Sequence, residues 1–178
     1  MKIRPRQSAR ETAAALLPRL AEKLFQAGDE LVGGEGGADR VHPFRIQTKR
    51  LRYVLEYFRP CYGEAMDAHI QAIKSLQQVL GELTDCYTTQ AVLEGVLRMG
   101  KSGRLQSLAG AMGSREAELT SQFSAFWRQT FPRGARRQFF QYLARPRPNN
   151  GAAPASRHRR AAQRRPPKRA RRRRRGEA

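Results

Sequence analysis

Apolar residues recur every three or four positions in four long segments of the chain, and this spacing decides what the chain can fold into. A period near 3.6 residues places such side chains on one face of a helix. The segments span about residues 8–32, 39–61, 64–97 and 105–130, and a shorter one spans 135–144. No stretch shows the sustained alternation of a strand. The sequence therefore predicts an all-α fold, an antiparallel four-helix bundle.

Two helix starts carry local signals. The run from Ser8 to Glu11 has the S-x-x-E form of a capping box, in which the Ser8 hydroxyl and the Glu11 carboxylate each satisfy a backbone N–H of the first turn. Pro43 is typical of a first helical turn, so the second helix is expected to begin just before it, with Asp39 or His42 as its cap.

The positive charge of the chain is divided unevenly. The net charge is +20, and residues 145–178 hold 14 basic residues and one acidic residue, against 21 and 14 in residues 1–144. Apart from proline, the last 34 residues contain no apolar side chain larger than alanine, so they cannot offset the entropy of ordering. We expect a helical body over 1–144 and a disordered basic tail over 145–178. A polyanion is the expected partner.

Several functional classes lack their sequence signals. Cys61 and Cys86 show neither metal-ligand nor disulfide-framework spacing, and no uninterrupted apolar run approaches 18 residues. P-loop, nucleophile-elbow and HExxH motifs are absent as well. We expect a cytoplasmic protein that spans no membrane, holds no metal or other cofactor and is not an enzyme.

The second segment carries a row of cations. His42, Arg45, Lys49 and Arg52 follow each other at steps of three, four and three residues, about 15 Å along a helix, opposite the apolar face. A solvated surface is one interpretation. A bound polyanion is the other, since cations at this spacing repel one another and Arg and Lys together can grip phosphates without reading bases. Tyr53 and Tyr57 beside the row suit packing or base stacking.

Two motifs resemble those of a known family. The run from Val41 to Tyr53 is similar to the H-x-x-R-x-x-x-K-R-L-R signature of the CHAD family, the conserved histidine α-helical domain, and the run from Leu76 to Asp85 is similar to its L-Q-x-x-L-G-x-x-x-D signature. The likeness covers about residues 8–130.

This resemblance implies a helical domain whose basic groove binds inorganic polyphosphate, and it implies an association with polyphosphate granules. The residues it assigns to binding are His42, Arg45, Lys49, Arg50, Arg52 and Lys74. The helical wheel places Arg50 away from the others. CHAD domains usually contain two such units, whereas this sequence holds one. The resemblance therefore implies either a homodimer or a truncated domain that binds more weakly.

Two other functions stay open at this point. The Arg-rich tail is typical of an arm that binds nucleic acid by counterion release, without sequence preference; a biased coding composition would produce the same tail. A purely structural bundle is the third alternative.

Overall fold

The computed structural model describes residues 8–34, 37–100 and 103–146, and all the secondary structure in these residues is helical. The elements are α1 (Ala9–Val32), α2 (Ala38–Phe58), the short 3-10 helix η1 (Arg59–Cys61), α3 (Ala65–Met99), α4 (Gly103–Thr130) and α5 (Arg133–Leu143). The all-α prediction is confirmed for this part of the chain. The predicted tail lies outside the described residues from position 147 onward, so its disorder stays a prediction.

The start of α1 follows the local sequence signal. The Ser8 backbone N–H donates to the Glu11 carboxylate at 2.8 Å, and the Glu11 N–H donates to the Ser8 hydroxyl at 3.3 Å. Both bonds of the predicted capping box are therefore present, and they satisfy two donors that a helix end leaves without partners.

The second helix starts within one residue of the predicted segment, but the predicted cap and the first-turn position of Pro43 were wrong. The helix begins at Ala38 after Gly37, so Pro43 lies inside it, and neither Asp39 nor His42 is the cap. Pro43 has no N–H to donate to the carbonyl of Asp39. Val41, in the turn before Pro43, is 3% exposed and adds apolar burial to this part of the helix.

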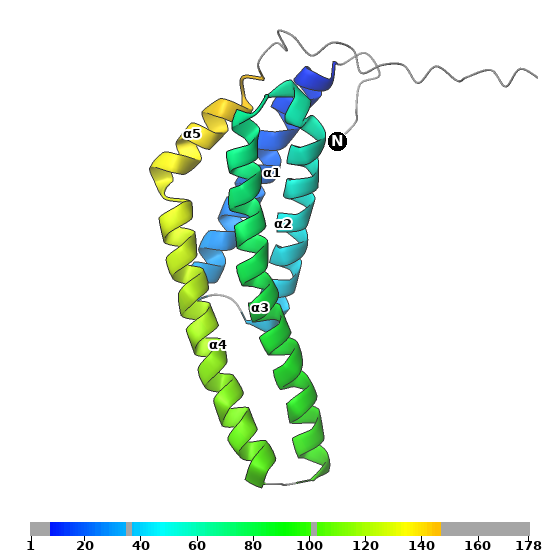
Figure 1. Cartoon of the computed structure of the whole chain (residues 1–178), viewed down its shortest axis with the longest axis vertical. Helices are drawn as coiled ribbons and strands as arrows, with labels where there is room; N and C mark the ends of the chain where they lie inside the picture. The colour runs from blue at the N-terminus through cyan, green and yellow to red at the C-terminus, as the bar shows by residue number, and fades with distance from the viewer. Residues whose placement is uncertain (1–7, 35–36, 101–102, 147–178) are drawn as a thin grey trace, which may run out of the picture.

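Each long helix packs against the next one along the chain (Figure 1). One apolar core joins α1, α2, the first two thirds of α3 and the second half of α4. Beyond Cys86, α3 buries only Leu93, and α4 buries only Leu119, Phe123 and Trp127. The far ends of α3 and α4 thus project beyond α1 and α2 as a two-helix hairpin (Figure 1). The closing of four helices into one bundle stays a prediction.

The short helix α5 folds back over α1 and α3. The Tyr62 hydroxyl donates to the Leu143 carbonyl at 2.7 Å, and Arg136 donates to both carboxylate oxygens of Asp29 at 2.6 and 2.7 Å. None of the five α-helices in the described part of the chain combines the length and the apolar character needed to cross a bilayer.

Candidate functional site

The predicted row of cations lies along the line where α2 packs against α3, which we call the α2–α3 boundary. His42 shares a hollow with Thr84 and Thr88 of α3 at one end of this line. At the other end, Glu56 of α2 lies 3.8 Å from the ammonium group of Lys74 of α3. Arg45, Lys49 and Arg52 follow the helical period between these two ends. The cationic row, defined as His42, Arg45, Lys49 and Arg52, therefore borders a second helix.

Burial of the neighbouring positions on α2 holds this row in place. Phe44, Leu51 and Leu55 are at most 2% exposed and face the core. Thr48 is also buried, and its hydroxyl donates to the Phe44 carbonyl at 2.9 Å, so it brings no unsatisfied group into the core. Arg45, Lys49 and Arg52 are half-buried beside this face. Their aliphatic stems pack against this face, and Arg45 and Arg52 are buried as far as Nε.

The hollow at the His42 end has a volume of about 310 Å³. It is lined by small and hydroxyl-bearing side chains from both helices: Ala38, Val41, His42, Thr84, Tyr87, Thr88 and Ala91. Burial, and then the charge of Glu116, raise the pKa of the Tyr87 hydroxyl, so this group stays neutral at physiological pH. The hollow gives the row a concave end.

Three nitrogen donors at the boundary have no hydrogen-bond partner in the described part of the chain. They are Arg45 Nε, Arg52 Nε and Gln77 Nε2, and each is buried. A buried donor without an acceptor costs free energy, about 1–3 kcal/mol in typical proteins. Oxygen atoms of a bound anion would reach these donors only after the side chains turn outward, because the three nitrogens are closed to a molecule the size of water. Gln77 was not predicted as a site residue, although it lies three positions after Lys74 within the second motif.

Acidic partners are found at only one end of the row. The guanidinium of Arg52 donates to Glu56 Oε1 at 2.9 Å and lies 4.4 Å from the ring centre of Tyr53. Within the described residues, no ion pair involves His42, Arg45 or Lys49. The middle of the cationic row therefore has no internal counter-charge.

The structure brings Lys74 to the row and places Arg50 elsewhere. Arg50 is exposed, and it lies about 140° around the helix from Arg45. This is the side of Pro43, which lines a different hollow together with residues of α1. Tyr57 is 77% exposed and Tyr53 is 56% exposed, so neither tyrosine belongs to the core.

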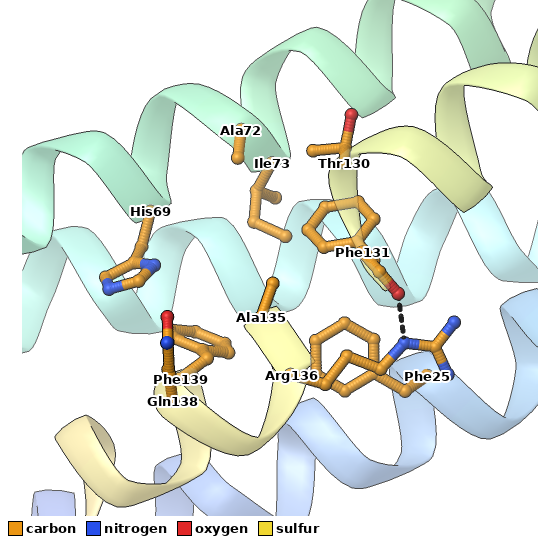
Figure 2. Close-up of a pocket in the computed structure, with 10 residues that line it drawn as sticks. All are labelled: Phe25, His69, Ala72, Ile73, Thr130, Phe131, Ala135, Arg136, Gln138 and Phe139. Atoms are coloured by element: carbon orange, nitrogen blue, oxygen red, sulfur yellow. Dashed lines mark hydrogen bonds between the residues drawn. The ribbon is translucent and has the colours of Figure 1, made fainter. Parts of the chain in front are cut away.

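A further hollow, of about 130 Å³, lies beneath α5, and aromatic side chains and Arg136 line it (Figure 2). Arg136 donates from Nε to the Phe131 carbonyl at 2.6 Å, and its remaining donors hold Asp29. The ring of His69 lies 4.5 Å from that of Phe139, centre to centre. Arg136 is thus occupied by structural partners, in contrast with Arg45 and Lys49.

No group of three or more His, Cys, Asp or Glu side chains in the described ranges is arranged to hold a metal ion. A family model described as CHAD domain matches residues 2–94, which include α1, α2 and most of α3. Both quoted motifs lie inside this match. No curated protein and no solved structure matches the chain.

Proposed function

The chain belongs to the CHAD domain family, and from this membership we propose that it is a non-catalytic module that binds inorganic polyphosphate along the α2–α3 boundary. The observation that carries the proposal is the state of Arg45 and Lys49. Both are half-buried cations without an acidic partner in the described residues, and Arg45 also holds a buried donor without an acceptor. A chain of phosphates supplies the counter-charge that both side chains lack.

Each residue of the boundary has a definite part in this proposal. Arg45 and Arg52 offer planar, bidentate donors to phosphate oxygens, and Lys49 adds a point charge between them. His42 contacts the ligand at the hollow, and Lys74 extends the positive surface onto α3. Arg50 contributes only through its long-range field, because it lies on another side of the helix.

The mode of binding that we propose requires no chemistry on the ligand. His42 lines the hollow with threonines, a tyrosine and aliphatic side chains, and the lining includes no carboxylate or cysteine that would act beside the histidine as a catalytic partner or a second metal ligand. The polymer is held and released unchanged, in the cytoplasm and at polyphosphate granules.

Pairing of two chains is a separate part of the proposal. The chain holds one copy of the two motifs, and a second copy would restore a longer basic surface with two-fold symmetry. Light scattering on the purified protein tests this, with a mass of twice 20.2 kDa as the expected result. A uniform monomer that binds polyphosphate tightly would contradict pairing and leave the binding proposal in place.

Nucleic-acid binding through the tail is the competing function, and the excess of 14 basic over one acidic residue in 145–178 favours it. The two functions differ in where the decisive residues lie. Counterion release by the tail depends on its total charge and falls steeply with added salt. Binding at the boundary depends on the positions of particular cations.

Charge reversal at two positions tests the proposal directly. Arg45→Glu with Lys49→Glu in the full chain is expected to reduce retention on immobilised polyphosphate at least about tenfold, because two charge-assisted contacts are lost. The matched control is Arg133→Glu with Arg137→Glu, which makes the same change in net charge at two exposed positions of α5. Equal losses for the two variants would show that only the total charge matters.

A further inference from the structure

Glu56 is the one acidic side chain that contacts the cationic row in the described residues. A single oxygen, Oε1, accepts from Arg52 at 2.9 Å and lies 3.8 Å from Lys74 Nζ. This oxygen joins α2 to α3 in the same way as a phosphate oxygen lying across the boundary would. The Glu56 carboxylate therefore lies at the end of the cationic row where a phosphate of the proposed ligand would bind.

We infer that Glu56 is a specificity-determining residue: its carboxylate competes with the ligand for Arg52 and Lys74 and so sets the length of polyphosphate that the site engages. This inference rests on the proposed polyphosphate function. With Glu56 in place, the open part of the row runs from His42 to Lys49, about 10 Å along the helix. Displacing Glu56 adds Arg52 and lengthens the row to about 15 Å.

The exposure of these side chains makes the competition feasible. The Arg52 side chain is 20% exposed and that of Glu56 is 36% exposed, so water and salt weaken their attraction. Ion pairs of this kind contribute little, and a change in one of them corresponds to about two- to fivefold in a binding constant. A polymer with many charges can replace a single carboxylate, whereas a short anion gains less by doing so.

The charge-neutral variant Glu56→Gln, made in the full chain, tests this inference. We expect affinity for long-chain polyphosphate at about 0.15 M salt to rise about two- to fivefold. Its salt dependence should become steeper, because phosphate then meets Arg52 and Lys74 without first displacing a carboxylate that already neutralises them. Tripolyphosphate, which fits within the open part of the row, should gain less. In an Arg52→Gln background the gain should shrink, because the cation that Glu56 neutralises is missing.

Glu82→Gln is the matched control. Glu82 is an exposed glutamate on α3 whose carboxylate lies 3.5 Å from Arg115, so the substitution removes the same charge from a different ion pair. We expect the affinity of Glu82→Gln for long-chain polyphosphate to rise by less than half as much as that of Glu56→Gln. If Glu56→Gln lowers the melting temperature strongly, Glu56→Asp replaces it. The aspartate keeps the charge but withdraws the carboxylate by one methylene, and a smaller gain in the same direction is expected.

Three results would overturn the inference: unchanged affinity in Glu56→Gln, weaker binding because Glu56 orients Arg52, or an equal gain in Glu82→Gln. In each of these cases the unaltered protein still binds polyphosphate, so the proposed function survives. A failure of the proposed function has a different signature, because neither the unaltered protein nor Glu56→Gln would then retain polyphosphate.

Discussion

The indole ring of Trp127 lies directly against the backbone of Gly28, so close that a Cβ on residue 28 would be 2.1 Å from the ring. The indole N–H donates to Asp29 at 2.9 Å, one residue further along α1. This contact fixes the second half of α4 to α1, and Asp29 in turn holds Arg136 of α5. The packing of α1 against α4 and α5 therefore needs glycine at position 28.

Gly28→Ala is expected to destabilise the protein by about 1–3 kcal/mol, because the ring has to move to admit the methyl group. Chemical denaturation followed by the fluorescence of Trp127 measures this change. Gly110→Ala is the control. A Cβ at position 110 would have no atom within 4 Å, and the substitution replaces a glycine inside α4 with a better helix former. It should stabilise α4 by about 0.5–1 kcal/mol. Destabilisation of similar size in both variants would contradict the packing argument.

Tyr62→Phe is expected to destabilise the protein by about 1–2 kcal/mol, because it leaves the Leu143 carbonyl without its buried donor. The Tyr62 side chain is 1% exposed, and burial raises the pKa of its hydroxyl to about 12. Thermal melting measures the loss. Tyr57→Phe should leave the melting temperature unchanged, since Tyr57 is 77% exposed. Equal stability of Tyr62→Phe and the unaltered protein would show that α5 does not depend on this bond.

Stability should fall as the pH is lowered below the ordinary pKa of histidine, 6.5. Burial lowers the pKa of His69, whose ring lies against those of Phe139 and Tyr142. The unfolded chain therefore binds a proton more readily than the folded chain does. The stability that comes from keeping His69 neutral is fully present above the pKa of this histidine in the unfolded chain. It is lost as the pH falls toward the lower pKa of His69 in the folded chain.

Urea unfolding at about pH 7.5 and about pH 5.5 measures this effect. His69→Phe removes the titrating group and keeps an aromatic ring beneath α5. Its unfolding midpoint should change less between the two conditions than that of the unaltered protein. An identical pH dependence in both proteins would assign the effect to other groups.

The parts of the fold that sequence predicted correctly depend on neighbours within one helix. The capping box needs only Ser8 and Glu11, and the apolar face that the helical period predicts opposite the cations is the face on which Phe44, Leu51 and Leu55 are buried. Pro43 was misplaced because its preference for a first turn is local, whereas the helix that begins at Ala38 buries Val41 against other helices.

In the candidate site too, the features set within one helix were predicted and those set by packing between helices were not. The spacing of His42, Arg45, Lys49 and Arg52 was visible in one segment, and their shared side of α2 follows from the helical period. The link from Glu56 to Lys74 and the buried amide of Gln77 depend on how α2 and α3 are aligned, which no local pattern contains. The contact between Gly28 and Trp127 spans 99 positions and had no sequence signal.

The claim that the α2–α3 boundary, and not the Arg-rich tail, selects the ligand is tested most directly by competition. Labelled polyphosphate is bound at about 0.15 M salt and displaced with unlabelled polyphosphate or duplex DNA, for the full chain and for a chain that ends at Pro146. The shorter chain keeps all the core residues of the described part, which lie between Ala13 and Leu143. We predict that it still binds polyphosphate and that duplex DNA displaces it poorly. Equal displacement by both polymers, or loss of binding with the tail, would contradict the account.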